Sequence, residues 1–220
     1  CRLVSEAELA LSELVREVIA VCQIPAPTFH EAERAAYVER RMKEIGLVEV
    51  RRDATGNVIG RLRGRGAGPS LLIAAHLDTV FPPGTDVTVR QDGDVLRAPG
   101  VGDNSSSVAT MLHAARLLVK HEVQPAGDVI FAATCGEEGL GNLEGMRAVV
   151  EALKDEIDYV IALDGSLGGM VREGVGSRRF RLVVTTSGGH SWGAFGAPSA
   201  IHSLGRIIAR LSEMRVPTNP

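Results

Sequence analysis

The 220-residue sequence contains little cysteine, and it lacks any apolar run of the length that a membrane span needs. Its three cysteines, Cys1, Cys22 and Cys135, are odd in number and widely spaced, which predicts free thiols and argues against a disulfide framework. Free thiols are typical of a reducing compartment, so we expect a cytoplasmic protein. A helical span takes roughly 20 apolar residues, and no basic segment followed by an apolar stretch indicates a signal peptide.

A strong excess of charge of either sign is also missing. The net charge of −3 argues against nucleic acid or an anionic membrane as the main partner. A hydrophobic share of 45% and a charged share of 23% are ordinary for a soluble globular protein. The length lies between that of one large domain and that of two small ones.

Alternating strand and helix patterns indicate the fold class. Short apolar runs typical of buried strands cover residues 70–75, 129–134 and 159–163. Apolar stripes with helical spacing lie over residues 108–119 and 146–153. We therefore expect an α/β fold, a three-layer sandwich with a largely parallel or mixed sheet.

Capping signals predict two helices before the first of these strands. Ser5 and Glu8 form a capping box ahead of one helix. Thr28 and Glu31 form a second box, ahead of a helix that Gly46 closes. Two hairpins are also expected, with arms at residues 48–52 and 57–62 and at residues 87–89 and 95–97.

Acidic residues and one histidine follow the apolar runs or precede a helix. They are His76, Asp78, Asp103, Glu137, Glu138 and Asp164. In an open α/β sheet, ligands bind just beyond the carboxyl ends of the strands. Carboxylates gathered there repel one another unless a cation neutralises them. The pattern therefore predicts a metal site.

The motifs around these residues resemble the co-catalytic zinc exopeptidase and deacylase family, which includes glutamate carboxypeptidase, aminoacylase and peptidase T. The resemblance rests on Ala75–Pro82, Gly102–Asn104 and Gly136–Gly141, which follow the family's order. Gly188–Ser191 is similar to the histidine motif of the family's smaller lid domain. The resemblance implies a metal-dependent hydrolase that cleaves an amide bond in a small peptide or an N-acyl amino acid.

The resemblance also implies a role for each residue. Two divalent metal ions are implied, most simply Zn²⁺ with Mn²⁺ or Co²⁺ as replacements, held by His76, Asp103, Glu138 and Asp164. Asp103 is expected to bridge the two metals, and Glu137 is expected to be the general base. His190 is expected to stabilise the oxyanion that forms on the substrate in the active site of a neighbouring subunit. Residues two apart in an extended segment point to the same side, so Asp78 can accept the second imidazole proton of His76 and fix its tautomer.

The resemblance further implies two domains. Residues 1–176 are expected to form the catalytic domain without its C-terminal part, and residues 177–220 the first half of a lid that mediates homodimerisation. Within the lid, residues 180–185 are expected to form a strand, and Pro198 to start a helix with its apolar side chains inward. The family's second metal takes one more histidine, which no motif here matches, so we expect the 220-residue chain alone to be incomplete and inactive.

Two alternatives stay open at this point. One is a two-zinc aminopeptidase without a lid, against which the Gly188–Ser191 segment argues. The other is a metal-deficient relative, or a fragment that binds partners without catalysis. The pattern leaves open the exact substrate and the choice between exopeptidase and deacylase. The remaining histidines are expected at surface or packing positions; they are His30, His113, His121 and His202.

Overall fold

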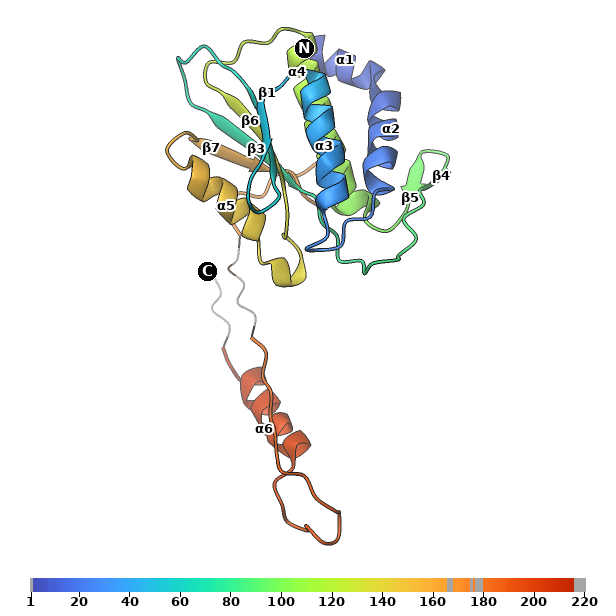
Figure 1. Cartoon of the computed structure of the whole chain (residues 1–220), viewed down its shortest axis with the longest axis vertical. Coiled ribbons are helices and arrows are strands. Elements are labelled where there is room, and N and C mark those ends of the chain that lie inside the picture. Colours follow the sequence, from blue (N-terminus) through green and yellow to red (C-terminus); the bar gives the residue numbers. More distant parts are fainter. Residues whose placement is uncertain (1, 166–167, 175, 177–179, 216–220) are drawn as a thin grey trace. The chain divides into compact units, whose positions relative to one another are not determined.

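The computed structural model of the chain describes residues 2–165, 168–174, 176 and 180–215. The chain divides into two compact units, Cys1–Gly169 and Met170–Pro220 (Figure 1). The expected domain boundary at residues 176–177 adjoins residues 175 and 177–179, which lie outside the described residues. That boundary is therefore still a prediction.

A mixed five-stranded sheet with the order β1-β2-β6-β3-β7 forms the centre of the first unit. Its strands are β1 (Val48–Arg52), β2 (Val58–Leu62), β3 (Leu71–His76), β6 (Val129–Thr134) and β7 (Tyr159–Ala162). β2 pairs antiparallel with both β1 and β6, whereas β3 pairs parallel with both β6 and β7. The carboxyl ends of β6, β3 and β7 consequently meet at one edge of the sheet. The expectation of a largely parallel or mixed sheet is confirmed.

Helices cover both faces of this sheet, with α3 and α4 on one side and α5 on the other (Figure 1). The helices of this unit are α1 (Arg2–Leu9), α2 (Leu11–Cys22), α3 (Ala32–Ile45), α4 (Ser107–Lys120) and α5 (Glu144–Leu153). Alternate residues of a strand point to opposite faces. Phe131 of β6 accordingly packs with Val38 and Met111 of α3 and α4, and Ile130 packs with Val149 of α5. The predicted three-layer sandwich is confirmed.

None of the helices in the described part of the chain is both long and apolar enough to cross a membrane.

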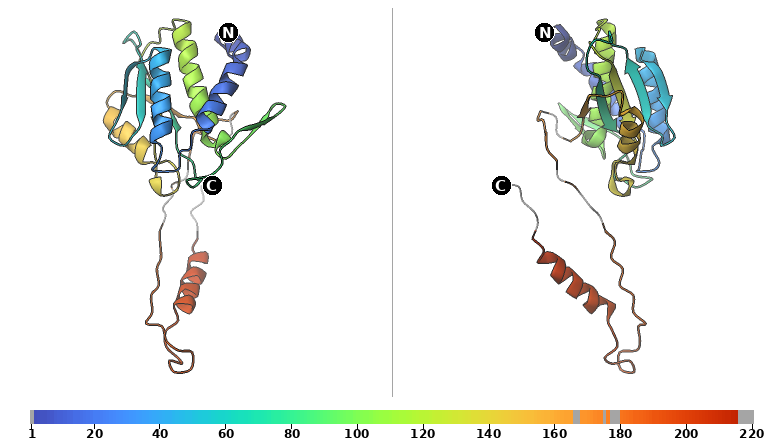
Figure 2. Two further views of the ribbon diagram at one scale, coloured as in Figure 1. Left: turned by 45° about the vertical axis from the view of Figure 1, so that its right-hand side comes forward. Right: turned by 90° about the vertical axis from the view of Figure 1, so that its left-hand side faces the viewer.

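The predicted hairpins both form, but the second is shifted. β4 (Arg90–Asp92) pairs with β5 (Val95–Arg97), so the arm expected at residues 87–89 is wrong. The register pairs Asp92 with Val95 across a two-residue turn, which places Arg90 opposite Arg97 and leaves residues 87–89 outside the hairpin pairing. This hairpin projects from the rest of the first unit (Figure 2).

Both predicted capping boxes are wrong. A capping residue needs non-helical backbone, yet α1 runs through Ser5 from Arg2. The hydroxyl of Thr28 donates to Asp78 at 3.0 Å instead of capping α3. Tertiary contacts therefore outcompete the local caps at Thr28, while the predicted end of α3 at Gly46 is confirmed by its left-handed φ of 96°.

The second unit contains α6 (Ala200–Ser212), which confirms the helix expected after Pro198 (Figure 2). Ser199 caps it by accepting a hydrogen bond from the main-chain N–H of His202. The strand expected at residues 180–185 is not formed. A strand needs a neighbour to satisfy its N–H and C=O groups, and the described residues of this unit supply none. The inward packing expected for α6 is also wrong, since none of its side chains is buried.

Candidate metal centre

His76 is the centre of the site. It is the last residue of β3 and is only 4% exposed. Its Nε2 lies 3.0 Å from Oδ1 of Asp103 and 3.7 Å from Oδ1 of Asp164. Its Nδ1 lies 3.0 Å from the main-chain oxygen of Asp78. With the proton on Nδ1 donated to this carbonyl, Nε2 offers its lone pair toward the two carboxylates.

Asp103 and Asp164 reach His76 from two separate loops. Asp103 lies in η1 (Val101–Ser106), a short irregular helical turn before α4, and Asp164 follows β7. Asn104 joins the loops, because its side-chain amide donates to the main-chain oxygen of Leu163 at 3.0 Å. Both carboxylates are about half-exposed, and they face the solvent edge of the site.

Asp78 is completely buried, and its carboxylate holds the main chain of the loop after β6 that carries Glu137 and Glu138, here called the glutamate loop. It accepts hydrogen bonds from the main-chain N–H groups of Glu137 and Glu138, at 3.0 and 2.9 Å, and from the hydroxyl of Thr28. Burial raises the pKa of Asp78, but its hydrogen bonds with His76 and with these donors outweigh burial and lower the pKa. The carboxylate is 3.5 Å from Nδ1 of His76, so the main-chain oxygen is the nearer acceptor there.

Two groups of potential metal ligands share His76. One contains Asp103 and Asp164, and the other contains Glu137 and Glu138; within each group the ligand atoms lie within 4.8 Å of one another. The structure thus gathers at one sheet edge the residues that the sequence places far apart. Among the described residues, no further histidine joins either group.

The ionisable groups of the site are short of positive charge. Burial and the charges of Asp164, Asp78 and Asp103 raise the pKa of Glu137, with His76 opposing them. Burial, followed by the charges of Asp103 and Glu137, raises the pKa of Glu138. Burial lowers the pKa of His76, but its hydrogen bond with Asp78 and the charges around it outweigh burial and raise the pKa to about 9. These carboxylates favour an added cation.

The donor set fits a divalent metal. It offers one imidazole nitrogen and several carboxylate oxygens, which suit zinc and, less selectively, manganese or cobalt. No lysine or arginine in the described part of the chain forms an ion pair with Asp103, Glu137, Glu138 or Asp164. Within the described residues their charge is therefore offset by His76 alone, and a metal ion can take the place of the His76 proton.

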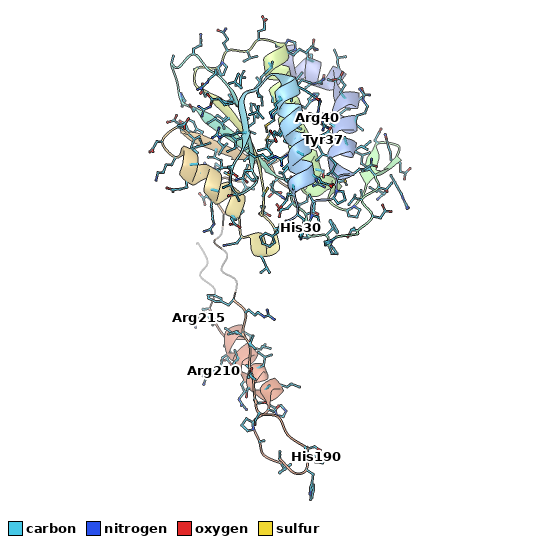
Figure 3. The ribbon with its side chains drawn as sticks, in the orientation of Figure 1. His30, Tyr37, Arg40, His190, Arg210 and Arg215 are labelled. Atoms are coloured by element: carbon cyan, nitrogen blue, oxygen red, sulfur yellow. The ribbon has the colours of Figure 1, made fainter. Side chains whose placement is uncertain are left out.

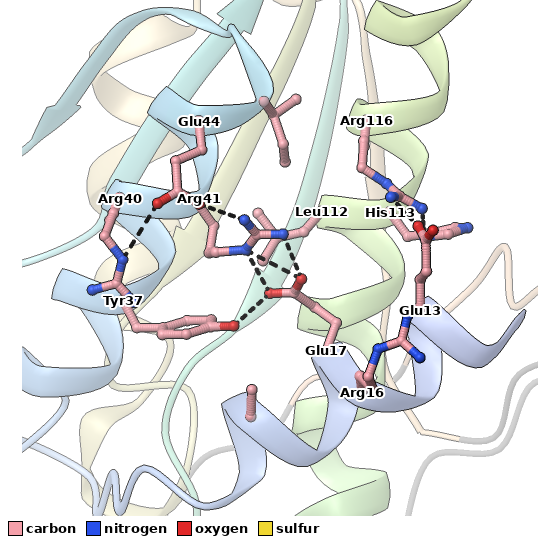
Figure 4. A pocket seen from close by; sticks show the side chains of 12 residues that line it. Glu13, Arg16, Glu17, Tyr37, Arg40, Arg41, Glu44, Leu112, His113 and Arg116 are labelled. Atoms are coloured by element: carbon pink, nitrogen blue, oxygen red, sulfur yellow. Dashed lines mark hydrogen bonds and ion pairs between the residues drawn. The ribbon is translucent and has the colours of Figure 1, made fainter. Parts of the chain in front are cut away.

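A small pocket of about 90 Å³ adjoins the centre. Its polar lining includes His76, Glu137 and Asp164, and its apolar lining includes Leu143 and Met146 of the α5 region. The larger cavity, of about 480 Å³, lies elsewhere, between α2, α3 and α4 (Figure 4).

The larger cavity is lined by an ion-pair network. Glu17 pairs with Arg41 at 2.8 Å and accepts a hydrogen bond from the Tyr37 hydroxyl, and Glu13 pairs with Arg116 (Figure 4). These carboxylates are already neutralised by arginines, and none of the predicted site residues lines the cavity. Among the described residues, the larger cavity therefore offers no uncompensated carboxylate to a metal ion, and we do not regard it as the candidate site.

His190 belongs to the second unit, in the loop before α6 (Figure 3). Its Nδ1 accepts hydrogen bonds from the main-chain N–H groups of Trp192 and Gly193. The site described above lies wholly in the first unit, so the role expected for His190 is still a prediction. The other histidines join neither ligand group; they are His30, His113, His121 and His202.

The supporting roles of four residues were not predicted from the sequence. The residues are Thr28, Glu31, Arg34 and Asn104. Arg34 left a trace in the sequence, because it continues the apolar stripe of Val38 and Met42 at the same four-residue spacing. A charged residue inside such a stripe is rarely buried without a specific partner.

The mixed sheet carries a histidine and several carboxylates beyond the carboxyl ends of its parallel strands, which is where open α/β sheets bind ligands. The profile of peptidase family M28 matches residues 57–192, more than half of the chain, and this range contains every predicted site residue. The chain belongs to peptidase family M28.

The chain is also similar to two curated proteins and to a solved structure. Carboxypeptidase G2 of Pseudomonas sp. (strain RS-16) is 27% identical over 74% of this chain and 40% of its own length. Succinyl-diaminopimelate desuccinylase of Legionella pneumophila (strain Corby) is 31% identical over 67% of this chain and 43% of its own. The crystal structure of aminopeptidase PepT from Bacillus cereus ATCC 10987 superposes with a TM-score of 0.59 at 27% identity, over 69% of this chain and 43% of that one.

The resemblance to the zinc exopeptidase and deacylase family is thereby confirmed. The chain spans about two fifths of the length of these relatives, from 40% to 43%.

Proposed function

We propose that the protein is a metal-dependent hydrolase that cleaves an amide bond in a small peptide or an N-acyl amino acid. The observation that carries the proposal is the convergence of His76 with two carboxylate pairs at the carboxyl edge of β3, β6 and β7. A cluster of this charge, with raised glutamate pKa values, favours a divalent cation over solvent.

Two cations fit the donor set, with zinc as the first choice and manganese or cobalt as replacements. His76, Asp103 and Asp164 would hold the first, and Glu138 would bind the second, with Asp103 shared between them. When bound, such a pair would polarise the scissile carbonyl and lower the pKa of water, so that water could lose a proton and attack the carbonyl near neutral pH.

Glu137 is the general base of the proposed reaction. As water attacks the carbonyl carbon, Glu137 accepts the proton that the water loses. The C–N bond then breaks, and Glu137 gives this proton to the leaving nitrogen. A raised pKa suits both transfers, because a base works best when its pKa lies near the working pH.

Asp78 supports this chemistry without touching the substrate. Its main-chain oxygen accepts the Nδ1 proton of His76, and its carboxylate holds the main chain of Glu137 and Glu138. It therefore orients both the imidazole ligand and the general base.

The names of the relatives support an amide substrate, since they include a carboxypeptidase, an aminopeptidase and a desuccinylase. Oxyanion stabilisation by His190 and homodimerisation through the second unit remain part of the proposal. So does a cytoplasmic location, which the buried and unpaired thiols of Cys22 and Cys135 support.

The experiment is a hydrolysis assay on the full-length protein with dipeptides, aminoacyl anilides and N-succinyl or N-acetyl amino acids. We expect turnover of at least one class, its loss after chelation, and its recovery with Zn²⁺, Mn²⁺ or Co²⁺. Activity that survives complete metal removal would refute the proposal. Metal binding without turnover of any amide would favour a non-catalytic relative. Turnover confined to substrates with a free amino terminus would favour an aminopeptidase.

A further inference from the structure

Arg34 of α3 is a buried cation with an unusual set of partners. Its side chain is 1% exposed. Its Nη1 donates to the main-chain oxygen of Leu77 at 2.7 Å, and its Nε and Nη2 donate to that of Ile24 at 2.9 and 2.6 Å. Among the described residues it forms no ion pair, so carbonyl oxygens alone satisfy its charge directly. Burial accordingly lowers the pKa of Arg34 to about 10.

The carbonyl of Leu77 belongs to the peptide unit between Leu77 and Asp78, and Leu77 itself lies between His76 and Asp78. Leu77 is fully buried, and its N–H donates to the main-chain oxygen of Thr134 at 2.7 Å. Arg34 holds the opposite end of the residue. With both ends of Leu77 fixed, the plane of the Leu77–Asp78 peptide is set, and with it the position of the Asp78 main chain beside His76. The next peptide, which carries the Asp78 carbonyl, is held by the N–H of Thr79, which donates to the main-chain oxygen of Ala26 at 2.9 Å.

The same end of α3 also holds the glutamate loop. Oε1 of Glu31, the residue before α3, accepts hydrogen bonds from the main-chain N–H groups of Phe29 and Gly136, at 3.0 and 3.1 Å. Gly136 directly precedes Glu137. Glu31 and Arg34 therefore attach the start of α3 to the two chain segments that carry the imidazole ligand and the general base.

We propose that Arg34 is a positioning residue for the metal centre, which sets the His76–Asp78 turn through the carbonyl of Leu77. The inference rests on the metal site of the proposed function. A planar guanidinium can donate at once to Ile24 and Leu77, which lie on separate segments, whereas an ammonium group offers a single point of charge. A buried ion is also a weak source of stability compared with an apolar side chain of similar size. Geometry, more than fold stability, accounts for an arginine at this position.

Zinc affinity tests the proposal without recourse to activity. The metal-free protein is titrated with zinc against a chromophoric chelator, for the parent, Arg34→Met, Arg34→Lys and Val38→Ala. Val38 is the matched control, because it is fully buried on the same helix, one turn on, and its apolar side chain makes no hydrogen bond to the chain segments of the site. Thermal unfolding of each variant reports its loss of stability.

We expect both Arg34 variants to bind zinc about 10- to 100-fold more weakly, the range typical of residues that orient metal ligands. Val38→Ala should lower the melting temperature and leave zinc affinity unchanged. If Arg34→Met does not fold, Arg34→Lys decides, since it keeps the charge and the alkyl stem. In Arg34→Ala, millimolar methylguanidinium should restore affinity by occupying the vacated donor position.

Zinc affinity equal to that of the parent in the Arg34 variants would overturn the inference and leave the proposed function standing. An equal loss of affinity in Val38→Ala would also overturn it, by showing a general effect of stability. Failure of the parent itself to bind zinc would refute the metal centre and the inference together.

Discussion

The carboxylate of Asp78 accepts a hydrogen bond of 3.0 Å from the main-chain N–H of Glu137. The two residues lie 59 positions apart, at the ends of neighbouring parallel strands β3 and β6. The contact fixes Glu137, the proposed general base, relative to His76, the proposed imidazole ligand, through the main chain, and it leaves the Glu137 side chain free to move a proton. The second oxygen of Asp78 does the same for Glu138.

Replacing Asp78 with asparagine should damage this arrangement. Asparagine turns one of the two acceptors into a donor, which would face a main-chain N–H of Glu137 or Glu138. We expect zinc affinity and hydrolysis each to fall by about 10- to 100-fold. Thr28→Val removes one hydrogen bond to the same carboxylate and serves as the control, with a loss of about 1 kcal/mol of stability and little change in affinity. Equal effects in both variants would show that the charge of Asp78 is unimportant.

Alanine substitutions of Glu137 and Glu138 should differ in their effects on metal content and on the rate of hydrolysis. Glu137→Ala should reduce hydrolysis by about a hundredfold or more at near-normal metal content, as removal of a general base does. Glu138→Ala should lower metal occupancy as well. Elemental analysis and steady-state kinetics on the same samples measure both quantities. The reverse pattern would exchange the two roles.

The stability of the metal-free protein should depend on pH through His76. Its pKa is raised from 6.5 to about 9, so the folded state binds this proton more tightly than the unfolded state. The resulting stabilisation is complete below pH 6.5 and is lost as the pH rises through about 9. The shift corresponds to about 3 kcal/mol. Urea unfolding at pH 6, 7.5 and 9 should show this decline. His76→Asn should remove it, and a decline that persists in His76→Asn would assign it to another group.

The sheet and its helices could be predicted because their signals are local. β3, β6 and β7 are short apolar runs that end at polar residues, and α4 and α5 carry apolar stripes with helical spacing. Burial on both faces makes the run of a central strand such as β6 continuous, whereas β7 is an exposed edge strand that keeps the same apolar pattern. The edge of the sheet then brings His76, Glu137 and Asp164 together.

Contacts between distant segments could not be predicted in the same way. Thr28 has the spacing of a capping residue, but its hydroxyl is taken by Asp78, 50 positions away. Arg34 reaches Leu77 at a separation of 43 positions. The strand expected at residues 180–185 needs a partner strand that the described part of its unit does not supply. Local propensity limits the structures that a segment can form, and contacts with distant segments select one of them.

Metal stoichiometry tests the ligand assignment directly. His76, Asp103 and Asp164 supply one group with an imidazole, while the second group shares that imidazole and adds Glu137 and Glu138. We therefore expect the 220-residue chain to hold about one zinc tightly and the second weakly after dialysis. Elemental analysis of zinc per chain measures this. Two tightly held zinc ions would reveal a ligand beyond these groups, and none would refute the centre.

The apolar face of α6 should drive self-association. Ile201, Leu204, Ile208 and Leu211 share one side of this helix. Ile201 and Ile208 are 81% and 57% exposed. A contiguous apolar surface of this kind marks an interaction site or a cause of aggregation. We expect Ile208→Glu to shift the protein toward monomer in light scattering. Ala209→Glu adds the same charge to the polar side of the helix and should not. Equal responses would show that added charge, and not the apolar face, controls association.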